Sequence, residues 1–225
     1  MSKDETRRLL ILGAGGNCVD ILDIVLDLNA AAGRTVLEPA GWLDDDEALH
    51  GQRLHGLEVL GPLALAKQMP DCLLVNGIGS PHNHLRKPAI VAKTGAGPER
   101  FATLVHPLAS VSRFACLSPG AVLFPGVAVH SGAVVGAQVI ALANSVINHD
   151  DLIGDYVCIA SGVSLSGGVA VGPRAYVGSG ATVRGNLGIG EGALVGMGAV
   201  VVADVEPFAV VAGNPARVIR RREPT

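Results

Sequence analysis

Residues 147–182 read INHDDL IGDYVC IASGVS LSGGVA VGPRAY VGSGAT, which is a run of consecutive six-residue blocks. Each block begins with an aliphatic residue, and the same phase continues in both directions along the chain. The sixteen residues in this phase are Val111, Leu117, Leu123, Val129, Val135, Ala141, Ile147, Ile153, Ile159, Leu165, Val171, Val177, Val183, Ile189, Val195 and Val201. Neither a helix of 3.6 residues per turn nor the two-residue alternation of a strand produces a fixed period of six.

This period predicts a triangular solenoid, in which each block forms one flat face and its aliphatic residue points inward. Three blocks complete one coil, so the array corresponds to about five coils stacked at the spacing of parallel strands. A small residue often follows the aliphatic one, as in Val135-Gly136 and Val171-Gly172, and permits a sharp corner. A narrow core of this kind fits a chain with 30 glycines and only 3% aromatic residues.

The N-terminal half follows a different pattern, in which strand-like and helix-like segments alternate. Strands are expected at 9–12, 40–43 and 73–78, and helical segments at 19–28, 62–69 and 88–93. A glycine turn, Gly13-Ala14-Gly15-Gly16, lies between the first strand and the first helix. The sequence therefore predicts a small α/β domain with parallel strands over residues 1–105. The solenoid domain follows over residues 106–225 and ends in a C-terminal tail.

Composition and charge exclude several functional classes. A net charge of -3 gives no general attraction to nucleic acid or to anionic membranes. The start of the chain has no signal-peptide pattern, and every long apolar run is interrupted, so we expect a cytoplasmic protein without a membrane span. The four cysteines are scattered without a Cys-x-x-Cys pair, which favours neither a zinc site nor a disulfide framework.

Five further stretches connect the chain to a known family: ILGAGG at 11–16, WLDDD at 42–46, IGS at 78–80, VINHD at 146–150 and VAGNPA at 211–216. With the hexapeptide array, they resemble the bacterial acyltransferases in which a Rossmann-like domain precedes a left-handed parallel β-helix. That branch includes N-acetyltransferases of nucleotide-linked amino sugars and sialic acid O-acetyltransferases. The resemblance covers almost the whole chain. It implies a homotrimer that transfers an acetyl group from acetyl-CoA to the amino group of a nucleotide-linked amino sugar, without a metal.

Acetyl transfer from a thioester needs a base for the attacking group and a donor for the developing oxyanion. His149 is the predicted base, because it follows the inward residue Ile147 by two places and therefore lies at a corner. Asp150 follows it and is expected to orient the imidazole. A coil of eighteen residues places Gly167 one coil above His149, where it leaves space for the thioester. In the enzymes that the chain resembles, a glycine amide at this place contacts the acetyl carbonyl, so Gly167 is the expected oxyanion donor.

The resemblance also implies where the two substrates bind. CoA is expected in a groove between two subunits, at Cys158, Ser179 and Met197, with Arg217 near a phosphate; many relatives have a histidine in place of Cys158. The sugar nucleotide is expected at the ends of the parallel strands of the first domain, where backbone amides and carboxylates are available. The residues expected there are Gly15, Gly16, Asn17, Asp44, Asp45 and Gly79. Two positions depart from the usual patterns: Cys18 replaces the last glycine of Gly-x-Gly-x-x-Gly, and Asn17 replaces a histidine frequent in relatives.

Four other functions fit part of the sequence. A dinucleotide-dependent oxidoreductase accounts for the glycine turn and Asp44 but not for the hexapeptide array. A zinc hydratase with a β-helix needs three histidines, whereas the repeat region supplies only His130 and His149. Sialic acid or another sugar can be the acceptor of an O-acetyltransferase, and a sugar-binding scaffold without turnover has the same sequence features. The identity of the sugar and of its nucleotide stays open.

Overall fold

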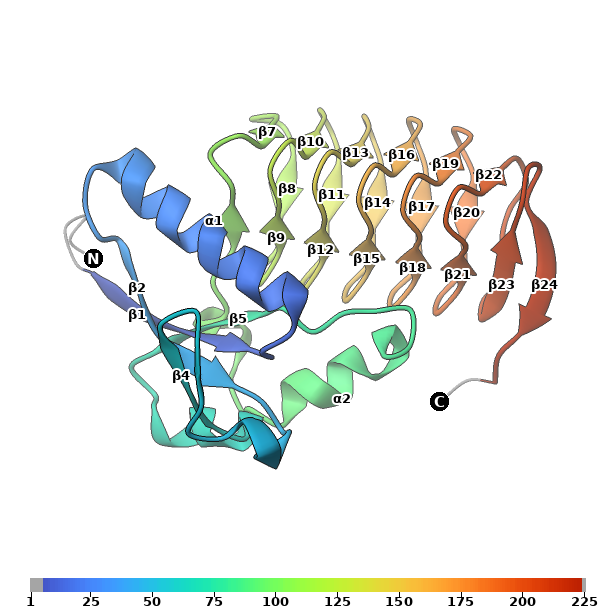
Figure 1. Cartoon of the computed structure of the whole chain (residues 1–225). Helices are drawn as coiled ribbons and strands as arrows, with labels where there is room; N and C mark the ends of the chain where they lie inside the picture. Colours follow the sequence, from blue (N-terminus) through green and yellow to red (C-terminus); the bar gives the residue numbers. More distant parts are fainter. Residues whose placement is uncertain (1–5, 224–225) are drawn as a thin grey trace. The chain divides into compact units, whose positions relative to one another are not determined.

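The computed structural model describes residues 6–223, which form two compact units (Figure 1). Unit 1 comprises residues 6–78 and 88–107, and unit 2 comprises residues 79–87 and 108–223. The glycine turn belongs to unit 1, and the hexapeptide array belongs to unit 2.

Unit 1 is built on a sheet with the strand order β3-β4-β2-β1-β5. Its strands are β1 (Arg7–Leu12), β2 (Leu37–Leu43), β3 (Arg53–Leu54), β4 (Leu57–Gly61) and β5 (Leu73–Asn76), and β6 (Leu104–Val105) lies outside this sheet. All neighbours pair in parallel except β3 and β4. The apolar end of β1, residues 9–12, is fully buried, as expected for a central parallel strand. The strands predicted at 9–12 and 40–43 fall within β1 and β2, whereas the third strand ends at Asn76, earlier than predicted.

Helix α1 (Gly16–Ala32) follows the glycine turn and buries one apolar stripe, which includes Ile21 and Val25. It ends at Gly33, whose φ of 65° lies in the left-handed region that favours glycine. The predicted segment at 62–69 forms the 3₁₀ helix η2 (Leu63–Gln68), and the segment at 88–93 lies largely in α2 (Lys87–Ala92). The remaining 3₁₀ turns are η1 (Glu47–Leu49), η3 (His84–Arg86) and η4 (Pro98–Arg100).

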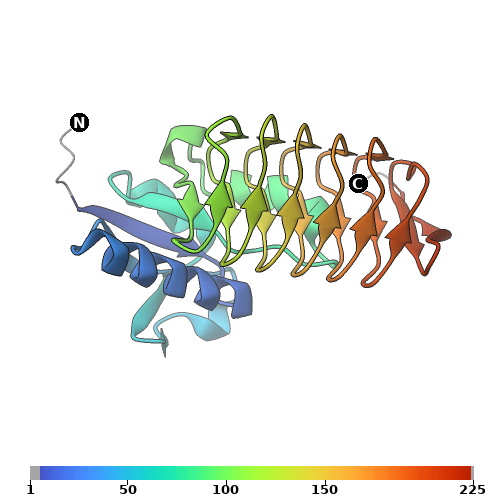
Figure 2. The same ribbon diagram turned by 90° about the horizontal axis from the view of Figure 1, so that it is seen from above.

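Unit 2 contains a parallel β-helix, whose coils follow one another in Figure 2. Its two-residue strands are β7 (Ser110–Val111), β8 (Cys116–Leu117), β9 (Val122–Leu123), β10 (Ala128–Val129), β11 (Val134–Val135), β12 (Ile140–Ala141), β13 (Val146–Ile147), β14 (Leu152–Ile153), β15 (Cys158–Ile159), β16 (Ser164–Leu165), β17 (Ala170–Val171), β18 (Tyr176–Val177), β19 (Thr182–Val183), β20 (Gly188–Ile189), β21 (Leu194–Val195) and β22 (Val200–Val201). The antiparallel pair β23 (Ala209–Ala212) and β24 (Arg217–Arg221) follows β22 along the chain.

The strands of the β-helix form three faces, and each strand pairs with strands three places away in the chain. The first face runs β7-β10-β13-β16-β19-β22, the second runs β8-β11-β14-β17-β20, and the third contains β9-β12-β15-β18-β21, to which β23 and β24 are added. Paired residues are eighteen positions apart, as in Cys158 and Tyr176, so the predicted coil length is confirmed.

Two inward columns fill the β-helix. Fourteen of the sixteen predicted aliphatic residues are buried, and the other two, Val111 and Leu117, belong to the first coil. A second column, which the sequence interpretation did not include, lies two residues before each of them and is mostly Ala and Val. Small and branched residues alternate in this way because the space inside the coils is narrow and closely packed.

We predict that Ile189→Ala destabilises the protein much more than Ile219→Ala. The Ile189 side chain is 2% exposed in the core of the β-helix, whereas Ile219 is 67% exposed on β24. Truncating a buried isoleucine typically costs about 2–5 kcal/mol in the free energy of unfolding, and a surface change costs about 0.5 kcal/mol or less. Urea denaturation followed by circular dichroism measures both. Equal losses for the two variants would contradict the assignment of Ile189 to the core.

Candidate functional site

The corner between β13 and β14 carries His149 and Asp150. Asp150 has a left-handed backbone with φ of 62°, at the turn position that the adjacent coils fill with Gly132 and Gly168. Its Oδ2 lies 2.9 Å from Nδ1 of His149. A carboxylate at this nitrogen accepts the Nδ1 proton of a neutral imidazole and leaves the Nε2 lone pair available. Both side chains are exposed, at 61% and 72%, so this lone pair is accessible to a substrate.

Gly167 lies against the His149 ring, one coil further along the β-helix. A Cβ atom at position 167 would overlap ring atoms of His149, so the imidazole occupies space that only glycine leaves free. The adjacent Gly168 N–H donates to the His149 carbonyl over 2.9 Å and fixes the two corners to each other. The Gly167 N–H makes no hydrogen bond to another described residue. The structure thus brings His149, Asp150 and Gly167 together.

Asp151 is a feature of this corner that the sequence interpretation missed. Its side chain is fully buried and accepts hydrogen bonds from the backbone N–H groups of Asn148, at 2.7 Å, and Val169, at 2.8 Å. Burial raises the pKa of Asp151 to about 6, even though these two bonds and the nearby His149 act in the opposite direction. The sequence contained a signal, because Asp151 stands in the second inward column, where its neighbours along the chain are small or aliphatic.

Cys158 lies on the third face of the β-helix, at the start of β15, and not at the His149 corner. Its side chain is only 5% exposed. The Lys87 ammonium is fully buried, lies 3.3 Å from the Cys158 sulfur, and donates to the Gln138 carbonyl over 2.9 Å. Gly79 packs against the same sulfur. Gly79 was expected at the strand ends of the first domain, but it belongs to unit 2.

Ser179 and Met197 lie in successive coils at one corner, the corner that follows the third face. The Gly198 N–H donates to the Ser179 carbonyl over 2.8 Å, and the Met197 side chain is 81% exposed. Arg217 begins β24 and is also exposed. Within one chain, these residues and the His149 corner therefore occupy different edges of the β-helix.

The glycine turn of unit 1 exposes the start of α1. Gly15 precedes the helix without a side-chain cap, both Gly15 and Gly16 are exposed, and Asn17 lies in the first turn. Gly13 has φ of 93° and packs against Ile78 and Cys18, so it shapes the turn itself. Free N–H groups at a helix start are suited to bind an anion, and the helix dipole adds to this effect.

Cys18 explains why this turn departs from Gly-x-Gly-x-x-Gly. Its sulfur packs closely against both Gly13 and Gly77. Burial raises the pKa of the Cys18 thiol to about 12, and its sulfur lies 3.6 Å from the Leu12 carbonyl. Cys18 is therefore a neutral packing residue, whose small side chain takes the place of the last glycine.

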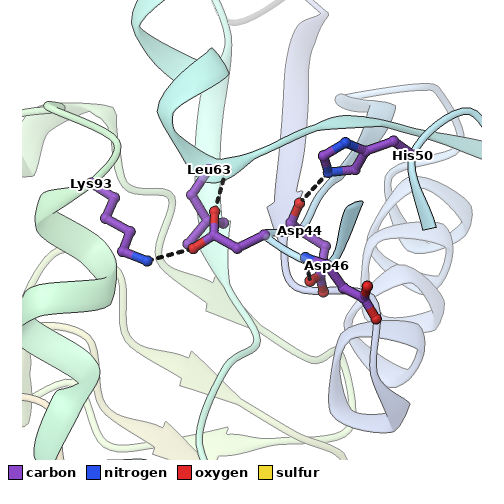
Figure 3. A network of polar contacts seen from close by, with 6 residues as sticks. Asp44, Asp46, His50, Leu63 and Lys93 are labelled. Carbon is purple, nitrogen blue, oxygen red and sulfur yellow. Dashed lines mark hydrogen bonds and ion pairs between the residues drawn. The ribbon is translucent and has the colours of Figure 1, made fainter. Parts of the chain in front are cut away.

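Asp44, Asp45 and Asp46 form the loop after β2, and each carboxylate accepts a backbone N–H. Figure 3 shows part of this network, with the bond between Asp46 and Asp44 and the side chains of Lys93 and His50 around the loop. Asp44 Oδ2 accepts from Ala14 N at 2.9 Å, which ties the loop to the glycine turn. Asp45 Oδ2 lies 2.6 Å from Nζ of Lys93. Partial burial pushes the pKa of Asp45 upward, but the bonds from Lys93 and Leu63 outweigh it, so the pKa is lowered. The Asp45 carboxylate is therefore ionised at neutral pH, and Asp44 lies beside the glycine turn that precedes α1.

Residues 6–223 contain no group of three His, Cys, Asp or Glu side chains that could hold a metal ion. Within the same range, no helix is long and apolar enough to cross a membrane.

Comparison with solved structures finds whole-chain relatives. The acetyltransferase domain of PglB from Neisseria gonorrhoeae, in complex with acetyl coenzyme A, has 28% identity and a TM-score of 0.80 over 96% of this chain and all of its own. PerB from Caulobacter crescentus, in complex with CoA and GDP-perosamine, has 29% identity and a TM-score of 0.76 over 93% of this chain and 96% of its own. WeeI from Acinetobacter baumannii has 27% identity and a TM-score of 0.80, with coverage of 95% and 100%. No family model and no curated protein matches the sequence.

Proposed function

We propose that this protein is an acetyl-CoA-dependent N-acetyltransferase whose acceptor is the amino group of a nucleotide-linked amino sugar. The observation that carries the proposal is the His149–Asp150 pair beneath Gly167, on a fold that matches structures bound to acetyl coenzyme A or to CoA and GDP-perosamine. A histidine-to-alanine variant of GDP-perosamine N-acetyltransferase from Caulobacter crescentus, also in complex with CoA and GDP-perosamine, supports the same assignment.

The corner supplies a base and an oxyanion donor on opposite sides of the reacting carbonyl. The sugar nitrogen attacks the thioester carbon, and Nε2 of His149 takes the proton that the nitrogen loses. The free Gly167 N–H donates to the carbonyl oxygen as negative charge develops there. The C–S bond then breaks, and the CoA thiolate leaves with the proton that the His149 imidazolium gives back, which returns the imidazole to its neutral form. Asp150 keeps the imidazole in the accepting tautomer and stabilises the imidazolium.

The transfer is direct, without an acetyl-enzyme. Cys158 is the candidate nucleophile for such an intermediate. The structure gives it a neighbouring amine, Lys87, which the sequence did not reveal. Its buried side chain on another face of the β-helix supports a binding or packing role rather than covalent catalysis.

Unit 1, residues 6–78 and 88–107, is the proposed nucleotide-sugar domain, and we propose a Rossmann-like fold for it. The central position of β1, the parallel neighbours β2 and β5, and the exposed glycine turn before α1 support this assignment. The α1 start is suited to the diphosphate, and Asp44 and Asp45 are placed to accept sugar or ribose hydroxyl protons. Residues 106–225 form the proposed acyltransferase domain, a left-handed β-helix.

A homotrimer explains why the expected CoA residues lie away from His149 within one chain. Three copies side by side can bring the Ser179 and Met197 corner of one subunit to the His149 corner of the next. An apolar groove of about 450 Å³ on the second face, with Val134 and Leu152 at 41% and 55% exposure, offers surface for such packing.

The acceptor prediction is tested by turnover. We expect acetyl transfer from acetyl-CoA to nucleotide-linked amino sugars, and none to free sialic acid. Because the transfer is direct, double-reciprocal plots should intersect, as for a ternary complex. Parallel lines together with acetylated Cys158 in a mass spectrum would overturn the mechanism. Turnover of free sialic acid, or of a hydroxyl sugar alone, would overturn the choice of acceptor in favour of O-acetylation, and tight sugar binding without turnover would show a scaffold.

His149→Ala should fold normally and lose a factor of about 10² to 10⁴ in kcat, which is the usual contribution of a positioned base. Asp150→Asn should lose less, because the imidazole remains. Steady-state rates at saturating substrates measure both, and circular dichroism verifies the fold. Near wild-type kcat for His149→Ala would remove His149 from the mechanism.

We predict a trimer in solution with three shared sites. Light scattering should give the mass of three chains. Mixing subunits tests the sharing, because His149→Ala and Met197→Arg damage opposite sides of one site. Co-assembled mixed trimers should regain activity that neither variant has alone. A fully active monomer, or mixed trimers without regained activity, would contradict the shared site.

A further inference from the structure

The geometry points to Asp151 as a positioning residue that fixes the spacing between His149 and Gly167. This inference rests on the proposed function, because that function gives His149 and Gly167 their roles. Its basis is structural: Asp151 is the only fully or nearly fully buried carboxylate among the described residues, and it lies inside the coil that carries His149.

The same place in the other coils is apolar. Counting in steps of eighteen, the residues that stack with Asp151 are Ala115, Ala133, Val169, Leu187 and Val205. Four of these neighbours, all except Ala115, are buried with their side chains in the core. A carboxylate here gains nothing from the hydrophobic core and needs hydrogen bonds to offset its burial. The sequence introduces it only in the coil of the predicted base.

Asp151 replaces a backbone bond that the other coils keep. In four other coils, the residue that stacks with Asn148 donates its N–H to a carbonyl of the next coil; these bonds are Ser112 to Val129, His130 to Ile147, Ser166 to Val183, and Arg184 to Val201. The Asn148 N–H instead donates to Asp151 Oδ2. In agreement, β13 and β16 pair only at Val146 and Ser164, whereas the other adjacent pairs of this face keep two register positions.

The second carboxylate oxygen of Asp151 bonds to the next coil, at the place where the Asn148 N–H no longer does. Oδ1 accepts from the N–H of Val169, eighteen residues further, two residues after Gly167. The corresponding amides of Ala115 and Ala133 donate within their own turns, to Ser112 and His130. One carboxylate therefore bonds the segment before His149 to the segment after Gly167. The His149 N–H is itself held by the Asn148 side chain at 2.9 Å.

The two hydrogen bonds that Asp151 accepts take the place of the regular backbone bond between these coils and hold the coils in register. Without them, the Asn148 N–H would return to the ladder, and no carboxylate would connect the segment before His149 to the segment after Gly167. The base and the oxyanion donor must both reach one carbonyl group, so a shift of about 1 Å in their spacing can cost about 10²-fold in rate. Asp151 contacts no substrate in this arrangement and acts through His149 and Gly167.

The ionisation of Asp151 is consistent with a role other than stability. The charged groups that act on it are His149 and Asp150 of its own corner; the facing residues, 166–169 and Ala133, carry no titratable side chain. Since burial raises its pKa to about 6 in the folded protein, from 3.8, its contribution to stability is complete below about pH 4 and declines as the pH rises through 6. At pH 8 the ionised carboxylate therefore stabilises the fold less than the protonated carboxyl does at pH 4.

The test compares Asp151→Asn and Asp151→Ala with Asp155→Asn. Asp155 is the matched control, since its carboxylate also bonds a backbone amide eighteen residues away, Ala137 at 2.7 Å, but at the next corner and on the surface. We expect both Asp151 variants to lose about 10- to 100-fold in kcat with KM for both substrates changed less than about threefold. Their Tm should fall less than that of the wild type between pH 4 and pH 8, because the carboxylate whose pKa burial raises is absent. Asp155→Asn should keep wild-type kcat.

NMR spectroscopy monitors the His149 corner by a measurement that does not depend on enzymatic activity. In the His149→Ala background, which removes the imidazole titration, the amide protons of Asn148 and Val169 should shift in NMR spectra with an apparent pKa above the ordinary value of an aspartate, because burial raises the pKa of Asp151. Adding Asp151→Asn should abolish both shifts and change the hydrogen exchange of residues 148 and 167. If the amides do not titrate, the carboxylate does not hold the two segments and the inference is wrong.

The outcomes separate this inference from the proposed function. Wild-type kcat in Asp151→Asn, with an inactive His149→Ala, overturns the positioning role and leaves the function intact. A Tm at pH 8 that falls in parallel with kcat shows a merely structural role and also overturns it. If the wild-type protein acetylates no acceptor, the proposed function fails, and the NMR titration alone then decides whether Asp151 holds the corner.

Discussion

The backbone ladder between successive coils is the constraint on which unit 2 depends. Each face is a set of two-residue parallel strands that pair with residues eighteen positions away. Such short strands have little stability alone, so the coils must repeat their length and their inward residues to keep the ladder continuous. This makes residues that differ by eighteen in number neighbours in space, and it leaves the corners as the places where side chains can vary.

The candidate active corner follows from that constraint. A corner needs one residue with a left-handed backbone, which glycine supplies in adjacent coils and Asp150 supplies here. Because Asp150 accepts this conformation, its carboxylate reaches Nδ1 of the preceding His149. The next coil then has to be free of side chains above the imidazole, and Gly167 meets this need. The repeat therefore supplies the distances, and three residues supply the chemistry.

The parts of the protein that obey the repeat could be predicted, and the parts that interrupt it could not. The period of six predicted the coil length and the stacking of Gly167 on His149, because both depend only on counting. Counting could not place Lys87 beside Cys158, since residues 79–87 join the β-helix unit from outside the array. In the α/β unit, β4 was missed because its five residues mix Glu58 and Gly61 with the apolar ones. Asp44 was expected as a ligand-binding acid, and the structure adds that it also holds the glycine turn.

Two buried polar residues depart from the apolar repeat, and they differ in whether they change the backbone hydrogen bonds between coils. Ser145 and Asp151 are both buried polar residues in the second inward column. Ser145 donates to the Leu142 carbonyl of its own turn at 2.8 Å, so it satisfies itself locally, and the adjacent Val146 keeps its bond to the next coil. Asp151 instead draws one amide out of the ladder and binds a second amide across it. A buried polar side chain whose hydrogen bond lies within its own turn is compatible with any coil, because the bonds between coils stay unchanged. One that rebuilds the connection between two coils changes their geometry, and it does so where a base and an oxyanion donor must meet.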